Sequence, residues 1–276
     1  MAQGDLTRIR TNIAALNALN SLKSINNKIN VHQLRLATGK RLNQSSDDPA
    51  GLTIAKKLDA RARSLSQALS NVGEASNVLS IAEGGANNIQ ELIVQMREKV
   101  VQAANDTLGT QERNAIYQQL QELGSEIDQI VSSTTFNNIS LLTDSTLLTF
   151  QVGASGTEVL TFDVVGNFNS ATLAVSNLTV ATQALASASL LSIDNALTSV
   201  SNLLQTIGAR TQRLSVKEIS LTTNYTNTEA ARSRIEDADL AKEQLEASKY
   251  LILQQTATAI LAQANVQPQS ILSLFQ

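Results

Sequence analysis

Cysteine and tryptophan are absent from the 276-residue sequence, which also contains only two prolines and one histidine. The absence of cysteine excludes disulfide bonds and thiolate metal sites. The single histidine, His32, cannot form a His-Glu-x-x-His metalloprotease motif, which needs two histidines. A lone histidine on a helix is far more often a solvated or packed side chain than a base or a ligand. No phosphate-binding glycine loop with its lysine occurs either. The sequence therefore predicts no catalytic residue, no metal site and no cofactor, and we do not expect an enzyme.

Charge and hydropathy argue against two further classes of partner. The net charge is -3, so no basic face for nucleic acid is expected. No run of 18 or more apolar residues occurs, so we expect no membrane insertion, and the first residues do not resemble a cleaved secretory signal. Aromatic residues make up 3% of the chain, whereas compact globular cores use more large rings. This composition favours long helices that pack side by side through small residues.

The clearest helical periodicity lies in the second segment of the chain, where apolar or small residues recur at steps of four and three. This spacing is typical of a coiled coil or a helical bundle. Two adjacent glycines, Gly84 and Gly85, fall inside the segment, and there we expect a local bend or tight packing. The series comprises Leu58, Ala62, Leu65, Leu69, Val72, Ser76, Leu79, Ala82, Ala86, Ile89, Ile93, Met96, Val100 and Ala103.

Similar periodicity predicts helices near both ends, and the middle of the chain changes character. We expect helices over 49–105, 113–132 and 190–230, with further helices toward each terminus. Over 141–186 charges nearly vanish, and two alternating stretches flank a glycine turn, which predicts a β-hairpin from about Leu147 to Val165. The expected fold is mainly α, with long antiparallel helices forming a terminal coiled coil and a helical bundle around this small hairpin region.

A joint between two helices is predicted at "DDPAG", residues Asp47 to Gly51. Asp47 or Asp48 can accept hydrogen bonds from the first amides of a helix. Pro49 suits the first helical position, where its missing N–H is not needed. We interpret Asp47, Asp48, Pro49 and Gly51 as an inter-rod joint and helix cap. The acidic run Glu236, Asp237 and Asp239 is likewise interpreted as helix capping, in preference to a metal or acid/base set.

Several segments of the sequence, including this joint, resemble segments of the bacterial flagellins. "DDPAGLTIAKKL" (Asp47–Leu58) is similar to the family's Asp-Asp-Ala-Ala-Gly-Leu-Ala-Ile signature, with Pro49 in place of one alanine. "RTNIAALNALNSL" resembles the flagellin amino terminus, and "LTFQVGASGTEVLTFDV" resembles the family's hairpin. "ARSRIEDADLAKE" (Ala231–Glu243) and "ILQQTATAILAQANVQPQSILSLF" (Ile252–Phe275) resemble the carboxy-terminal signature. The resemblance covers essentially the whole chain in colinear order, as in a short flagellin with core domains only.

The resemblance implies a subunit that polymerises with itself into the extracellular filament used for swimming. It implies an inner-core coiled coil from 1–43 plus 233–276 and an outer core from 44–232. It also implies secretion through the flagellar type III export apparatus, with an export chaperone and with cap and junction proteins as partners. The residues expected to pack in the filament core are Ile9, Ile13, Leu16, Leu22, Ile25, Ile252, Ile260, Leu261, Ile271 and Leu274.

One segment resembles the part of flagellins that an innate immune receptor senses. Its stimulatory pattern is Arg-Val-Arg-Glu-Leu, and Gln95, Met96, Arg97, Glu98 and Lys99 stand at those positions here. The first arginine and the final leucine are both replaced, which implies poor recognition by the receptor.

A second structural class stays open from the sequence. The hook–filament junction proteins share flagellin-like ends and coiled-coil termini. The near-complete match at the carboxy terminus and the compact length favour flagellin. Copy number separates the two, because a filament needs thousands of subunits and a junction only about a ring of them.

Overall fold

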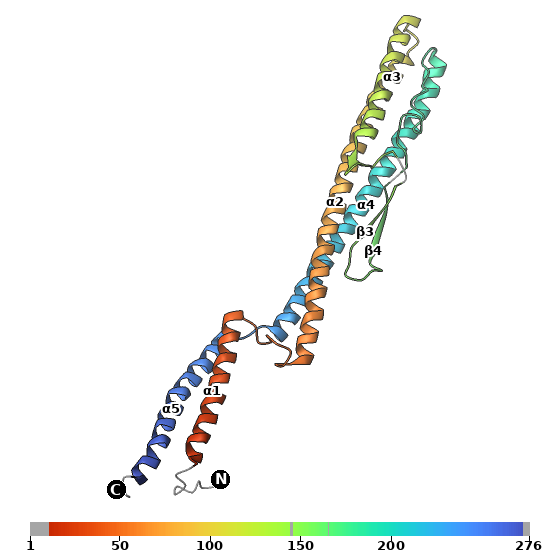
Figure 1. The fold of residues 1–276 in the computed structure, drawn as a ribbon. Helices are drawn as coiled ribbons and strands as arrows, with labels where there is room; N and C mark the ends of the chain where they lie inside the picture. The colour runs from red at the N-terminus through yellow and green to blue at the C-terminus, as the bar shows by residue number, and fades with distance from the viewer. Residues whose placement is uncertain (1–10, 144–145, 165, 273–276) are drawn as a thin grey trace. The chain divides into compact units, whose positions relative to one another are not determined.

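The computed structural model describes residues 11–143, 146–164 and 166–272, and most of them are helical (Figure 1). The mainly α prediction with a small hairpin region is confirmed. Among the described residues, no helix has an apolar stretch long enough to cross a membrane. In chain order the elements are α1 (Ile13–Thr38), α2 (Pro49–Ala103), α3 (Thr110–Ser133), β1 (Thr135–Phe136), β2 (Ile139–Ser140), β3 (Thr146–Gln151), β4 (Val159–Val164), α4 (Gln183–Glu236) and α5 (Leu240–Leu272).

The chain divides into two compact units. The terminal unit comprises residues 1–60 and 227–276, and the central unit comprises residues 61–226. The terminal unit therefore takes in the first turns of α2 and the last turns of α4 as well as α1 and α5. Its limit in α2, at residue 60, lies after the boundary of 43 expected from the sequence. Its limit in α4, at residue 227, lies before the expected boundary of 233.

The central unit is built around one hydrophobic core shared by α2, α3 and α4. Nearly every residue of the periodic series in α2 is buried, and Ile89, Ile93 and Met96 are among its largest fully enclosed side chains. On α4 the sequence shows a similar series at steps of three and four, which is buried or half-buried except at the exposed Glu218. The series comprises Val200, Leu203, Ile207, Thr211, Leu214, Glu218, Leu221 and Tyr225. Each of these enclosed side chains contributes to the stability of the unit by removing apolar surface from water.

The two glycines inside α2 occupy different environments. A Cβ at Gly85 would lie 2.6 Å from Oγ1 of Thr134 and 2.9 Å from Cδ1 of Leu142, whereas a Cβ at Gly84 would meet nothing within 4 Å. Gly85 therefore lets the segment after α3 approach the α2 backbone closely. The helix continues through both positions, so tight packing is the feature that the sequence signals there.

The hairpin of β3 and β4 packs beside the helices of the central unit. Its strands are antiparallel, with Phe150 opposite Leu160 and Gln151 opposite Val159. The side-chain amide of Asn71 in α2 donates to the backbone carbonyl of Gln151 at 2.8 Å. These observations place the hairpin where the alternating sequence predicts it.

Candidate functional site: the terminal helix pair and the junction

Helices α1 and α5 lie antiparallel and side by side in the terminal unit (Figure 1). Near one end, the Asn12 side chain caps α1 through Ala15 and also donates to the carbonyl of Ala264 at 2.7 Å. Further along, the amide of Gln254 donates to Asn26 Oδ1 at 2.7 Å. The two chain ends, far apart in sequence, therefore form one paired element.

The seam between these helices combines alanines with larger apolar and polar side chains. Buried or half-buried positions recur at steps of three and four on both helices, as in a coiled coil. On α1 they are Ala15, Ala18, Leu22, Ile25, Ile29, His32 and Leu36. On α5 they are Glu243, Ala247, Tyr250, Gln254, Ala257, Leu261 and Ala264.

The large apolar side chains of the pair are mostly outside this seam. Ile252 is 64% exposed and Leu245 is 66% exposed, and an open groove of about 480 Å³ near Asn12 is lined in part by Leu16 and Leu19. Exposed large apolar side chains in this number are uncommon on a protein that stays monomeric, so the outer surface of the pair has the character of an association surface. The exposed large apolar residues of the two helices are Ile13, Leu16, Leu19, Leu34, Leu240, Leu245, Leu251, Ile252, Leu253, Ile260 and Val266.

The residues expected to pack in a filament core divide between the seam and this exposed face. Leu22, Ile25 and Leu261 are half-buried in the seam. Ile13, Leu16, Ile252 and Ile260 are exposed. Ile9 and Leu274 lie outside the described residues, as does the side chain of Ile271.

The far end of the pair carries a polar cluster around Glu243, which is 8% exposed. Its carboxylate oxygens lie 2.5 Å from Nδ1 of His32 and 3.4 Å from Nη1 of Arg35. The imidazole also stacks on the ring of Tyr250, with 5.3 Å between ring centroids. His32 is thus a packed side chain in the helix interface. Among the described residues, no group of three histidine or acidic side chains could hold a metal ion.

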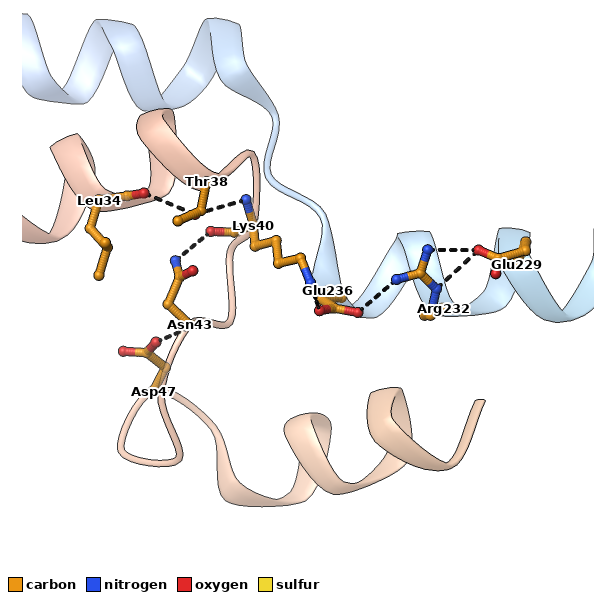
Figure 2. Close-up of polar contacts among 8 residues, drawn as sticks. All are labelled: Leu34, Thr38, Lys40, Asn43, Asp47, Glu229, Arg232 and Glu236. Atoms are coloured by element: carbon orange, nitrogen blue, oxygen red, sulfur yellow. Dashed lines mark hydrogen bonds and ion pairs between the residues drawn. The ribbon is translucent and has the colours of Figure 1, made fainter. Parts of the chain in front are cut away.

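Helix α1 ends at Thr38, and the next residue, Gly39, has a left-handed backbone conformation. Gly39 has a φ of 69°, and its backbone N–H donates to the carbonyl of Arg35 at 2.9 Å. Glycine adopts this conformation without a steric penalty, which makes it the common residue at helix ends. The Thr38 hydroxyl donates to the carbonyl of Leu34 and accepts from the backbone N–H of Lys40 (Figure 2).

After this end, the chain pairs through its backbone with the break between α4 and α5. Lys40 and Asp237 form an antiparallel bridge. The N–H of Arg41 donates to the carbonyl of Glu236 at 2.7 Å, and the N–H of Ala238 donates to the carbonyl of Gly39 at 3.0 Å. Both chain segments therefore leave their helices at the same level and are joined by main-chain hydrogen bonds.

A chain of charged side chains reinforces the bridge (Figure 2). Glu236 is 4% exposed, and its carboxylate accepts from Nζ of Lys40 at 2.5 Å and from Nη1 of Arg232 at 3.1 Å. Arg232 in turn pairs with Glu229 at 2.7 Å. The hydrogen bond from Lys40 lowers the pKa of the Glu236 carboxyl, with a smaller contribution from Arg232, against the opposing effect of burial. Buried carboxylates of this kind are retained as anions by their cationic partners.

The joint itself is held by two aspartates with different roles. Asp47 Oδ2 accepts from the backbone N–H groups of Asn43 and Gln44, which closes the turn before α2. Asp48 Oδ1 accepts from the N–H of Gly51 at 2.9 Å and caps α2, which begins at Pro49. This is the N-cap geometry that satisfies an otherwise unpaired amide of the first turn.

Gly51 is required beneath this cap. A Cβ at position 51 would lie 2.3 Å from Oδ2 of Asp48 and 3.1 Å from Cδ1 of the buried Leu42. The capping carboxylate and the Leu42 side chain thus occupy the space that any other residue would need.

The second break, between α4 and α5, falls at the acidic run that is interpreted from the sequence as helix capping. Asp239 Oδ1 accepts from the N–H groups of Ala241 and Lys242, so Asp239 caps α5 at Leu240. The capping preference of aspartate was the available signal. Each of the two paired segments therefore carries its own break and its own cap.

The segment that resembles the receptor-sensed region lies on α2 of the central unit. Gln95, Glu98 and Lys99 line an open groove beside α3, whereas Arg97 donates to Asp194 on α4 at 2.9 Å. The residue between them, Met96, is fully buried. The structure therefore does not bring the four charged or polar residues together on one face.

This fold and site define a helical coiled-coil protein. The described side chains cap helices, pair α1 with α5 and pack the core of the central unit. Residues 9–146 match the bacterial flagellin N-terminal helical region, and residues 190–275 match the bacterial flagellin C-terminal helical region. A flagellin from Halalkalibacterium halodurans is 35% identical, covering 97% of this chain and 99% of the relative. The chain belongs to the bacterial flagellin family.

Two solved structures share parts of the fold. The crystal structure of Bacillus cereus flagellin has a TM-score of 0.50 at 24% identity and covers 59% of this chain and 94% of its own. A structure described as a flagellar hook-associated protein from Vibrio parahaemolyticus has a TM-score of 0.59 at 18% identity. It covers 69% of this chain and 100% of its own. At these identities both show the fold alone, and the full-length flagellin relative does not favour the junction-protein alternative.

Proposed function

We propose that this chain is the structural subunit of a bacterial flagellar filament and assembles through its terminal helix pair. The observation that carries the proposal is the distribution of apolar side chains on α1 and α5. Among the described residues of the pair, four of the five buried apolar side chains are alanines, while Leu245, Ile252 and Ile260 remain exposed. Further copies of the chain would cover this surface, and its burial would drive polymerisation.

The proposed domain assignment follows from the same pair. Residues 1–43 and 233–276 would form the inner core of the filament, and residues 44–232 the outer core. Support comes from the breaks at Gly39–Asp48 and Asp237–Asp239, which separate α1 and α5 from the helices of the central unit. The joint of Asp47, Asp48, Pro49 and Gly51 then connects the two cores.

Family membership supports the proposed route and location. The chain would leave the cell through the flagellar type III export apparatus with an export chaperone. It would then polymerise outside the cell beneath a filament cap, on junction proteins. A chain without cysteine and with few aromatic residues suits passage in an unfolded state.

Removal of Ile252–Gln276 tests the function most directly. We expect the truncated protein to keep a folded central unit and to form no filaments, as judged by circular dichroism and negative-stain electron microscopy. Long filaments from the truncated protein would contradict the proposal. Full-length protein that forms only rings or short caps at high concentration would favour the junction protein instead.

Point variants separate the exposed apolar face from α5 as a whole. Ile252→Ser and Ile260→Ser should slow polymerisation and raise the protein concentration that it requires. Gln255→Ser and Gln263→Ser are matched controls, because these exposed side chains are already polar. Equal effects from both sets would mean that helix propensity, and not the apolar face, limits assembly.

We also propose that this chain is a poor activator of the flagellin-sensing receptor. Gln95 lacks the guanidinium fork that an arginine offers to a carboxylate. Lys99 places an ammonium where the pattern has leucine, and an unpaired charge is costly to bury. Losing one central anchor commonly costs about 2 kcal/mol or more, roughly thirtyfold in affinity. In a receptor-reporter assay Gln95→Arg with Lys99→Leu should gain potency, and full potency of the unaltered protein would refute the idea.

A further inference from the structure

The seam between α1 and α5 does not fix a register through its apolar side chains alone. Its α5 side offers Ala247, Ala257 and Ala264, which are nearly equivalent in size and shape. The positions of a coiled-coil seam repeat every seven residues, so a slip of α5 by one heptad would keep its seam positions against α1 and could place Ala264 at the level of Ala257. These two alanines do not distinguish the two alignments, so polar contacts across the seam are the candidates for selecting one.

Three polar contacts cross this seam at separated levels, and we name them rungs. The first joins Asn12 to Ala264, and the second joins Asn26 to Gln254. The third joins His32 and Arg35 to Glu243. Positions rise along α1 (12, 26, 32) as they fall along α5 (264, 254, 243), so all three rungs belong to one antiparallel register.

The residues one heptad away on α5 would not support these contacts. In a slipped pair, Asn26 would face Ala247 or Leu261 instead of Gln254, and its amide would lose its partner. An unsatisfied amide at a half-buried position is unfavourable, whereas the native alignment satisfies it. A mismatch of this kind penalises the wrong register, which apolar contacts alone would not do.

Burial of the charged groups of the third rung carries a desolvation cost that offsets much of their attraction. Glu243 is almost fully buried, and Nε of Arg35 is buried without a hydrogen-bond partner among the described residues. Replacing a buried ion pair by apolar side chains is often neutral or stabilising. Selection of a register is the best attested use of such groups in helix pairs.

We propose that the second and third rungs determine the register of α1 against α5 and thereby align their exposed apolar side chains for association with further copies. This inference rests on the proposed filament function. A slip by one heptad moves α5 by about 10 Å along α1. Exposed residues of α5 such as Ile252 would then stand opposite the wrong turn of α1, and the shared association surface would be broken.

The absence of cysteine allows this register to be measured directly. Nitroxide labels at Asn20→Cys and Gln263→Cys, both at exposed positions, report the distance between the helices by pulsed electron paramagnetic resonance. A small labelled fraction is polymerised with excess unlabelled protein of full length. What we call the rungless variant carries Asn26→Ala, Gln254→Ala and Glu243→Ala. These changes remove the second and third rungs, leave the first, and keep good helix formers.

We expect one distance for the wild-type rungs. For the rungless variant we expect a second, distinct distance, because a slip of one heptad moves the label on α5 by about 10 Å along the helix axis. Incorporation of the rungless variant into pelleted filaments should fall about tenfold. The control variant carries Asn27→Ala, Gln244→Ala and Gln255→Ala, which alter exposed neighbours of the rungs on the same two helices. It should keep both the distance and the incorporation of the wild type.

A swapped variant guards against a general loss of folding. Asn26→Gln with Gln254→Asn exchanges the partners of the second rung. Arg35→Glu with Glu243→Arg exchanges the ion pair of the third rung, without its His32 contact. Restored incorporation with a single distance supports the proposal, even if the rungless variant is excluded from filaments. Failure of the swap to restore incorporation, or a single unshifted distance in rungless filaments, overturns it. Absence of filaments from wild-type protein would instead overturn the proposed function.

Discussion

The central and terminal units use opposite strategies to hold helices together. The central unit encloses large side chains such as Ile93 and Ile207 completely, whereas the buried apolar side chains of the terminal pair are mostly alanines and Ile252 and Leu245 are exposed. The central unit therefore buries much apolar surface within the single chain. The terminal pair leaves large apolar side chains exposed, and under the proposed function these are the side chains that further copies would cover.

The largest effect should come from a cavity in the central core. Ile93→Ala removes a fully buried side chain and should lower the free energy of unfolding by about 2–5 kcal/mol. Ile252→Ala in the terminal pair should change it by less than about 0.5 kcal/mol, because that side chain is exposed in the single chain. Urea denaturation of the unpolymerised protein measures both. Similar losses from both variants would break the comparison.

A smaller effect should come from overpacking the same core. Gly85→Ala places a Cβ against Thr134 and Leu142 and should destabilise the central unit by about 1–3 kcal/mol. Gly84→Ala meets open space and should stabilise it by up to about 1 kcal/mol through helix propensity. Thermal melting followed by circular dichroism compares the two neighbours. Opposite signs are the expected result, and equal signs would exclude tight packing at Gly85.

Loss of the α2 cap should lower the thermal stability of the terminal unit. Asp48→Ala removes the acceptor for the N–H of Gly51 and should destabilise by about 0.5–2 kcal/mol. Ser45→Ala is the matched control, because Ser45 is exposed in the same loop. Differential scanning calorimetry of the polymerised protein compares their transition midpoints. If Asp48→Ala melts like the control, capping is not what holds the joint.

The smallest effect should appear as a dependence on pH at the junction. Because the folded pKa of Glu236 is lowered, its contribution is fully present above its ordinary pKa of 4.5 and is lost as pH falls through the lowered value. The stability of the polymerised protein should therefore decline more steeply below about pH 4.5 in the wild type than in Glu236→Gln. Thermal midpoints between pH 7 and pH 3 measure the slope.

Glu218→Gln is the control for that titration, since Glu218 is an exposed carboxylate on the same helix. It should retain the wild-type slope. Identical slopes for Glu236→Gln and the wild type would show that Lys40 and Arg232 do not couple the junction to pH.

The sequence was sufficient for the central helices because their periodic residues are large and apolar. The series from Leu65 to Val100 was readable at steps of three and four, and it is the series that the structure buries. The hairpin was readable for the same reason, since alternation with a glycine turn has few other interpretations.

The terminal seam was not readable in that way. The large side chains selected from the sequence divide, since Leu22 and Leu261 lie in the seam and Ile252 is exposed. The seam also runs through Ala18 and Ala257, which that selection does not include. Alanine is an equally good helix former on a buried or an exposed face, so it carries little information about burial. The rungs depend on side chains more than 200 positions apart, such as Asn26 and Gln254. No local pattern reports such pairs.

The turn of the hairpin has a practical consequence for adding sequence to the chain. Ala154, Ser155, Gly156 and Thr157 are exposed, and the ends of this turn are held together by the N–H of Val152 donating to the carbonyl of Glu158 at 3.0 Å. A foreign peptide inserted here begins and ends at points that the strands already fix. Loop closure becomes only slowly more unfavourable as an insert lengthens. The hairpin is therefore a natural graft point, where a peptide tag or epitope can be displayed while α1 and α5 keep their full sequence.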